Sequence, residues 1–383
     1  MTVQRLQPFG ETIFATMTAR AVEFNAINLG QGFPDSDGPT RMLEIAREEI
    51  AAGNNQYGPG RGMLALREAI SRQRLRDYNV AYDPDTEVLV TVGATEGITA
   101  TVLGLVEPGS EVIVLEPYYD AYAAAIALAG AHRVSVPLVT AGNSWTVDVD
   151  AVRAAITDRT AMIIVNSPHN PTGSVFAAAD LEELAEVAVS CDLLVLSDEV
   201  YEHLLFDDHT HTALASLPGM FERTVTVSSA AKTFNATGWK TGWALAPVEL
   251  MEGIIKAKQF MTYVGATPFQ PAVAWALDNA GDWLQGMVAE LAEGRDLLQE
   301  ALRATGLQVH DTHGTYFTVV DLPTGYDGVK FCMDLPEKAG LAAIPVEVFT
   351  DQSESWRRQV RFAFCKKPET LSRASSLLAQ LSF

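Results

Sequence analysis

Seven short apolar segments alternate with helix-length segments across the middle of the chain. Several of the short segments are apolar at every position, which is typical of strands that helices cover on both faces. They occupy residues 87–92, 111–116, 132–138, 161–167, 193–199, 224–230 and 242–247. Helix-length segments, such as 96–106 and 181–190, separate most of them. The alternation predicts an α/β fold whose mostly parallel sheet has about seven strands.

The regions on either side of this alternation have a different pattern. Apolar residues recur at helical spacing in segments 40–52, 62–77, 248–263 and 282–305, and Gly53 is placed to end the first of these helices. A chain of 383 residues is long enough for two domains of about 100–200 residues each. We therefore expect a large domain over 46–280 and a smaller α+β domain that combines 281–383 with the N-terminal segment 1–45.

The charge balance and the cysteines exclude several classes of function. The chain has 48 acidic side chains against 27 Lys and Arg, a formal net charge of −21. This excess argues against binding to nucleic acids or to an anionic membrane surface, because both require basic side chains. Three scattered cysteines, Cys191, Cys332 and Cys365, form neither a disulfide framework nor a metal-binding motif. With no signal-peptide pattern and no apolar segment of membrane-spanning length, we expect a cytoplasmic protein without a metal site.

Polar and aromatic residues follow five of the predicted strands. Because the carboxyl ends of parallel strands meet at one edge of a sheet, we expect these residues to converge on a single crevice. In chain order they are Gly93-Ala94-Thr95, Pro117-Tyr118-Tyr119, Asn166 to Asn170, Asp198 with Tyr201, and Ser229 with Lys232. The first group begins a helix, whose free N–H groups suit a phosphate. A lysine, a carboxylate, an aromatic ring and an anion site are together what pyridoxal phosphate requires.

The lysine lies in the motif SAAKTFNATGWKTGW, which runs from Ser229 to Trp243. Six shorter motifs accompany it: NLGQGFPD (28–35), NQYGPG (55–60), GAT (93–95), NSPHNPTG (166–173), SDEVY (197–201) and VRFAF (360–364). In this order and spacing they resemble the class I pyridoxal-phosphate aminotransferases of fold type I, over essentially the whole chain. The resemblance implies pyridoxal 5′-phosphate as cofactor, an amino acid and a 2-oxo acid as substrates, and a homodimer with shared active sites.

The resemblance also implies roles for the residues around the cofactor ring. Lys232 would bind the cofactor covalently and then act as the general base at the substrate, which a lysine can do once its pKa is lowered. Asp198 would pair with the ring nitrogen, and Tyr119 would stack on the ring face. Tyr201 and Asn170 would both bind the phenolic oxygen of the cofactor.

The phosphate of the cofactor would be held by Ser229, Lys240 and the backbone amides of Ala94 and Thr95. Lys240 stands where many members of the family carry arginine. It would therefore contact the phosphate through a single ammonium group and not through the two N–H arms of a guanidinium. Tyr57 would reach the phosphate bound by the neighbouring subunit.

Three residues are implied on the substrate side. Arg361 would bind the substrate α-carboxylate through a two-armed contact, a geometry that lysine cannot supply. Gly32 would lie against the substrate with its backbone, and Asn170 would also contact the substrate.

Several neighbours of these residues have a simpler structural interpretation. Glu199 follows Asp198 directly and is expected to point the other way, so it is interpreted as structural. Tyr118 and Tyr122 are interpreted as packing residues. His209-Thr210-His211 lacks a third metal ligand at a suitable spacing and is interpreted as a surface loop.

Within the family, the sequence is similar to two groups of enzymes. One is the actinobacterial N-succinyldiaminopimelate aminotransferases of lysine biosynthesis, and the other is the kynurenine/glutamine transaminases. The chain has Gly265-Ala266 where the second group tends to carry an aromatic–histidine pair, a loss of bulk that would open the side-chain pocket. This favours the first group, whose amino donor is succinylated and whose acceptor is 2-oxoglutarate. The alternatives are an aromatic or methionine aminotransferase and a β-lyase that cleaves cysteine conjugates or cystathionine.

The residues that would bind the far end of the amino donor are not evident from the sequence. The resemblance places Ile13, Phe14, Thr95, Gly265 and Ala266 near the side-chain pocket. None of them carries a positive charge for a distal carboxylate.

Overall fold

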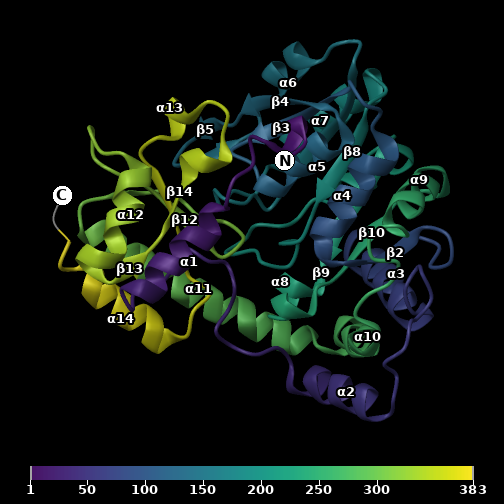
Figure 1. The fold of residues 1–383 in the computed structure, drawn as a ribbon, viewed down its shortest axis with the longest axis horizontal. Helices are drawn as coiled ribbons and strands as arrows, with labels where there is room; N and C mark the ends of the chain where they lie inside the picture. Colours follow the sequence, from purple (N-terminus) through teal and green to yellow (C-terminus); the bar gives the residue numbers. More distant parts are fainter. Residues whose placement is uncertain (1, 382–383) are drawn as a thin grey trace.

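The computed structural model describes residues 2–381 and is built around one seven-stranded sheet (Figure 1). Its strands are β2 (Val88–Val92), β3 (Glu111–Glu116), β4 (His132–Pro137), β7 (Thr160–Asn166), β8 (Leu194–Asp198), β9 (Thr224–Ser229) and β10 (Thr241–Leu245). They lie in the order β2-β10-β9-β8-β7-β3-β4, and only β10 runs antiparallel to its neighbours. Each of the seven predicted segments forms one strand, so the predicted fold class is confirmed.

Helices cover both faces of this sheet. The chain contains α1 (Ile13–Glu23), α2 (Thr40–Ala51), α3 (Leu64–Tyr78), α4 (Gly93–Leu105), α5 (Asp120–Ala129), α6 (Val149–Ala155), α7 (Ala178–Ser190), α8 (Ala230–Thr233), α9 (Val248–Lys258), α10 (Gln270–Asn279), α11 (Gly281–Ala304), α12 (Gly328–Ala339), α13 (Ser353–Trp356) and α14 (Pro368–Leu378). Alternate residues of β3 belong to different cores. Val112 and Val114 pack with residues of α4, α5 and α9, whereas Ile113 and Leu115 pack with residues of α6 and α7. This two-sided burial explains why the strand is apolar at every position.

A second, smaller sheet lies near the C-terminus of the chain (Figure 1). Its strands β11 (Gln308–Val309), β12 (Phe317–Asp321), β15 (Gln359–Ala363) and β14 (Ile344–Pro345) are antiparallel in this order. The N-terminal segment joins this region because β1 (Ile27–Asn28) pairs in parallel with β13 (Leu341–Ala342). Residues of α1, α11, α12 and α14 complete one shared core with them.

The division into a large domain over 46–280 and a small one from 1–45 and 281–383 stays a proposal. The pairing of β1 with β13 supports the assignment of both chain ends to one unit. Residue 46 falls inside α2, however, and Met42 and Ala46 of this helix share a core with α3 and α10.

Three elements differ from the sequence prediction. Helix α9 ends at Lys258 and not near residue 263. Turns follow it, and Tyr263 has a left-handed backbone with φ of 63° that an α-helix does not include. Helix α10 was not predicted, and neither was the hairpin of β5 (Val139–Ala141) and β6 (Ser144–Thr146). None of the described helices is both long and apolar enough to cross a lipid bilayer.

Candidate active site

A cavity of about 290 Å³ lies at the carboxyl ends of the parallel strands. Residues from many parts of the chain line it: Phe14, Gly32, Gly93, Ala94, Thr95, Ile98, Tyr119, Asn166, Asn170, Asp198, Val200, Tyr201, Ser229, Ala231, Lys232, Thr237, Lys240, Phe317 and Arg361. All but one of the residues with a predicted contact to the cofactor or the substrate are among them. Of the residues expected near the side-chain pocket, Phe14 and Thr95 line the cavity, whereas Ile13, Gly265 and Ala266 do not. The predicted convergence at this edge of the sheet is therefore observed.

Tyr57 is the residue with a predicted cofactor contact that does not line this cavity. Its side chain is 84% exposed, and its ring makes an edge-to-face contact with that of Tyr263 at 5.8 Å between centroids.

Lys232 projects from α8, which follows β9 directly. Its Nζ donates a hydrogen bond to the hydroxyl of Tyr316 at 2.8 Å, and that hydroxyl donates to the backbone oxygen of Gly32. Burial lowers the pKa of Lys232 to about 8, because the charged ammonium loses solvation. A lysine with this pKa can exchange a proton near neutral pH.

Asp198 ends β8 as a carboxylate that is 3% exposed. The hydroxyl of Tyr122 donates to its Oδ2 at 2.6 Å, and the amide of Val200 donates to Oδ1 at 3.3 Å. Burial raises the pKa of Asp198 to about 6, so the carboxylate is still ionised at pH 7. Within residues 2–381 no lysine or arginine forms an ion pair with it, and a ligand with a protonated ring nitrogen would supply the missing positive charge.

The first turn of α4 also lines the cavity and is suited to an anion. The first N–H groups of a helix have no partner within the helix and attract negative charge. Lys240, which has a left-handed backbone with φ of 52°, extends its side chain over this turn: a Cβ atom built on Gly93 would lie 3.0 Å from its Nζ. Ser229, at the end of β9, lines the same cavity. A phosphate group fits these donors.

Arg361 is buried in β15 and forms no ion pair with a carboxylate of the described residues. Its Nη1 donates to Oδ1 of Asn170 at 2.8 Å and its Nη2 to the backbone oxygen of Gly30 at 2.9 Å, while its Nε has no partner. The ring of Phe317 lies 3.9 Å from the guanidinium carbon, and burial lowers the pKa of Arg361 to about 10. A buried guanidinium of this kind is suited to a carboxylate supplied by a ligand.

Gly32 leaves no room for a side chain. A Cβ atom at this position would lie 2.5 Å from the ring of Phe317 and 2.7 Å from that of Tyr316. Its backbone therefore approaches the cavity more closely than any other residue type would allow.

Several residues of the site were given no functional role from the sequence. Tyr122 was interpreted as a packing residue, and this was wrong because its hydroxyl binds Asp198. Its position three residues after Tyr119, on the same helical face, could have indicated its direction. Tyr316 binds Lys232, and the amide of Asn166 donates to the backbone oxygen of Asp198 at 2.8 Å.

Gly265 and Ala266 do not line the cavity of this chain, and a Cβ atom on Gly265 would lie 2.4 Å from Val92. The effect of their small size on the side-chain pocket stays a prediction. One further interpretation needs correction. His211 lies in a loop, but its side chain is only 2% exposed and its Nε2 lies 3.0 Å from the Oε2 of Glu199. The interpretation of this segment as a surface loop was therefore wrong for His211.

Comparison with known proteins agrees with this arrangement. The family model described as aminotransferase class I and II matches residues 25–376. The chain is 54% identical over 392 residues to the probable N-succinyldiaminopimelate aminotransferase DapC of Mycobacterium tuberculosis, with 100% of this chain and 99% of that protein covered. The solved structure of the N-succinyldiaminopimelate aminotransferase from this organism has a TM-score of 0.97 at 55% identity, with 99% of both chains covered. The methionine aminotransferase of Escherichia coli is 38% identical, with 98% of this chain and 97% of that protein covered.

Proposed function

The chain belongs to the class I and II aminotransferases, and from this premise we propose that it uses pyridoxal 5′-phosphate to transfer the amino group of N-succinyl-LL-2,6-diaminopimelate to 2-oxoglutarate. Amino-group transfer between an amino acid and an oxo acid is the activity of the family. The identity of 54% over the full length of a probable N-succinyldiaminopimelate aminotransferase carries the choice of donor.

The donors that line the cavity fit pyridoxal phosphate. When bound, this cofactor withdraws electrons from the substrate Cα through its protonated ring. Lys232 would hold its aldehyde carbon, and Asp198 would hold the proton on its ring nitrogen. Tyr119 would cover the ring, and Tyr201 and Asn170 would bind its phenolic oxygen.

The phosphate group would occupy the anion site described above. Ser229, Lys240 and the amides of Ala94 and Thr95 would hold it, and Tyr57 of a second copy would complete the contact. The exposure of the Tyr57 ring supports this sharing and hence a homodimer.

The protein's own residues would position the substrate and move the proton. Arg361 would bind the α-carboxylate with its two-armed guanidinium while Asn170 keeps that guanidinium in place. Gly32 would lie against the substrate. Lys232, with its pKa near 8, would take the proton from the Cα of the amino donor. In the second half of the reaction it would give a proton back to the Cα of the acceptor.

One observation favours a second candidate donor. The three basic side chains that line the cavity, Lys232, Lys240 and Arg361, all have proposed roles, so none remains for a distal carboxylate. Phe14, which also lines the cavity, would suit an apolar side chain. The alternative is therefore an aminotransferase for methionine or aromatic amino acids.

A panel of amino donors with 2-oxoglutarate tests the proposal. Succinyl-diaminopimelate, methionine, phenylalanine, kynurenine, glutamine and aspartate are offered separately, and the glutamate formed is measured. We expect the largest kcat/KM with the succinylated donor. Turnover of methionine or phenylalanine without turnover of the succinylated donor would favour the alternative. Pyruvate release from cystathionine without an oxo acid would identify a β-lyase.

The Lys232→Ala variant tests the cofactor assignment. The wild-type protein with added pyridoxal phosphate should show the absorbance of a lysine-bound cofactor, and the variant should lack both this absorbance and steady-state transamination. An unchanged spectrum and rate would contradict the role of Lys232.

A further inference from the structure

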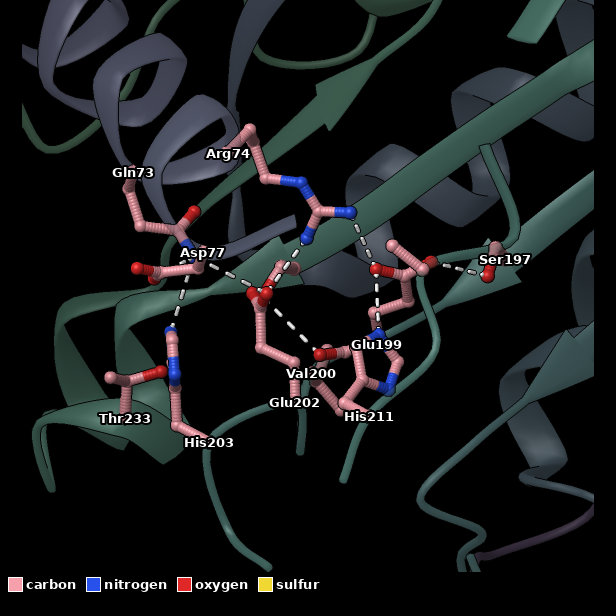
Figure 2. A network of polar contacts seen from close by, with 12 residues as sticks. Gln73, Arg74, Asp77, Ser197, Glu199, Val200, Glu202, His203, His211 and Thr233 are labelled. Atoms are coloured by element: carbon pink, nitrogen blue, oxygen red, sulfur yellow. Dashed lines mark hydrogen bonds and ion pairs between the residues drawn. The ribbon is translucent and has the colours of Figure 1, made fainter. Parts of the chain in front are cut away.

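Directly behind the cavity lies a buried group of charged and polar side chains, which we name the Arg74 cluster (Figure 2). It consists of Arg74, Glu199, Glu202, His211 and Ser228. Nη2 of Arg74 donates to Oε2 of Glu199, and Nη1 to Oε2 of Glu202, both at 2.7 Å. The side chains of all three ionic residues are at most 1% exposed.

Every carboxylate oxygen in the cluster has a partner. Ser197 donates to Oε1 of Glu199 at 2.8 Å, and Ser228 donates to Oε1 of Glu202 at 2.6 Å. Nε2 of His211 lies 3.0 Å from the oxygen of Glu199 that Arg74 also binds. These contacts hold the two carboxylates from several sides, while Nε of Arg74 and Nδ1 of His211 have no hydrogen-bond partner among the described residues.

Stability alone is a poor explanation for this cluster. Burying ions is expensive, and apolar residues of similar volume stabilise a fold at least as well. Burial by itself would raise the pKa of Glu199, but the attraction of Arg74 and His211 outweighs it and holds this pKa at about 2. With Glu202 also ionised, two buried carboxylates face one guanidinium.

The position of the cluster relative to the cavity suggests its role. Glu199 follows Asp198 directly, and Glu202 follows Tyr201 directly. Asp198 and Tyr201 line the cavity. Glu199 and Glu202 instead point to Arg74 (Figure 2).

The same relation holds on the neighbouring strand. Ser228 of β9 binds the cluster, and Ser229, the next residue, lines the cavity. Arg74 comes from α3, 125 residues before Glu199 and 128 before Glu202, so one side chain ties this helix to the segment that follows β8, and Glu202 in turn accepts a hydrogen bond from Ser228 of β9.

We infer that Arg74 is a positioning residue for the cofactor: by binding Glu199 and Glu202 together, it fixes the strand ends that present Asp198, Tyr201 and Ser229 to the cavity. This inference rests on the proposed use of pyridoxal phosphate. If it is correct, substitution of Arg74 changes the affinity for the cofactor and the absorbance of the bound cofactor, and not only the stability of the fold.

Two substitutions probe the cluster directly. Arg74→Lys keeps the charge but cannot bind two carboxylates in a fixed fork, and Glu202→Gln keeps the shape but removes one charge. Ser228→Ala is a milder change that removes a single hydrogen bond. It replaces the other two variants as the test if they fail to fold.

The matched control is Asp321→Asn. Asp321 forms a half-buried pair with His310 at 3.1 Å in the small sheet, and it lies four residues along β12 from Phe317. This variant removes a charged contact without touching the Arg74 cluster or the cavity.

The readouts are the melting temperature without cofactor, the affinity of the cofactor-free protein for pyridoxal phosphate, and the pH midpoint of the bound cofactor's absorbance. Arg74→Lys and Glu202→Gln should weaken cofactor binding about tenfold or more, as expected when a hydrogen bond to a charged group is lost. They should also move the pH midpoint by at least about 0.5 unit. Ser228→Ala should weaken binding about threefold. Asp321→Asn should lower the melting temperature but leave affinity and midpoint unchanged.

Wild-type affinity and an unchanged midpoint in the cluster variants that fold would overturn the inference, even if their melting temperatures fall. A wild-type protein that takes up no pyridoxal phosphate would overturn the proposed function as well. The two failures are therefore distinguishable.

Discussion

At the scale of single residues, the two ionisable groups nearest the proposed chemistry have pKa values shifted by burial. Lys232 has a pKa of about 8, lowered from 10.5, and Asp198 a pKa of about 6, raised from 3.8. Both shifts disfavour the charged form, which means that the cofactor-free site holds its charges at a cost in stability. A bound ligand that pairs with these charges removes this cost.

The lowered pKa of Lys232 makes a prediction about stability. Between pH 8 and 10.5 the unfolded lysine binds a proton that the folded one has released, so this residue's contribution to stability rises with pH in that window. Below pH 8 the buried ammonium destabilises the fold by about 3 kcal/mol. Cofactor-free Lys232→Met should therefore be more stable than the wild type at pH 7, and this difference should shrink as the pH approaches 10.5. Urea unfolding of both proteins across this range is the measurement, and a pH-independent difference would contradict the shift.

The hydroxyl of Tyr122 makes a second prediction, about Asp198. Removing this donor in Tyr122→Phe should raise the pKa of Asp198 further, by about 1 unit. The acidic limb of the profile of kcat/KM against pH should move upward, and cofactor binding should weaken. Tyr118→Phe is the control, because that hydroxyl donates to Asp351 at 3.1 Å, away from the cavity. Equal profiles for the two variants would show that the contact has no such effect.

How far the site could be predicted depends on where each residue lies relative to a strand. Asp198 and Lys232 follow strands directly, so topology alone places them at the crevice. Tyr316 comes from the loop before β12, and only the packing of the small sheet against the large one brings it to Lys232. Tyr122 is one of several tyrosines in its segment, and its contact depends on which of them faces the sheet.

At the scale of elements, the strands were predictable because burial on both faces makes them apolar throughout. Helix α10 begins with Gln270-Pro271 after a turn in which Ala266 has a positive φ of 56°. Its start depends on this turn and on packing against α2 and α3, neither of which a local pattern reveals. The hairpin β5–β6 is short, and β5 is exposed along its length, so no apolar alternation marks it.

The contact between β10 and α4 yields a prediction at this scale. A Cβ atom on Gly242 would lie 2.6 Å from the carbonyl carbon of Gly93 and 2.7 Å from the amide nitrogen of Ala94. Gly242→Ala should therefore displace the first turn of α4, lower the free energy of unfolding by about 1–3 kcal/mol and weaken cofactor binding.

Gly238→Ala is the control for this substitution. Gly238 lies in the same motif, but a Cβ atom there would meet nothing within 4 Å. Denaturant unfolding and cofactor titration of both variants are the measurements. If Gly242→Ala behaves like Gly238→Ala, the close approach of β10 to α4 does not control the anion site.

At the scale of the whole molecule, the exposed ring of Tyr57 predicts that two copies build each site together. Lys232→Ala and Tyr57→Ala should each have low activity alone. When the two variants are mixed and allowed to exchange subunits, half of the dimers carry both kinds of chain, and one site in each of these has an intact lysine and an intact tyrosine. The mixture should regain up to about a quarter of wild-type activity. Activity equal to the mean of the two separate variants would argue for sites within single chains.

The pairing of Ile27 with Leu341 has a consequence for the order in which the site is completed during synthesis. Ile27 leaves the ribosome 314 residues before its partner strand, since 341 minus 27 is 314. The cavity-lining residues that are proposed to hold the cofactor lie between residues 93 and 240, whereas the substrate side needs Gly32 held near Arg361 by the last strands. A nascent chain released before residue 361 would therefore have the elements that bind the cofactor but not those that select the amino acid.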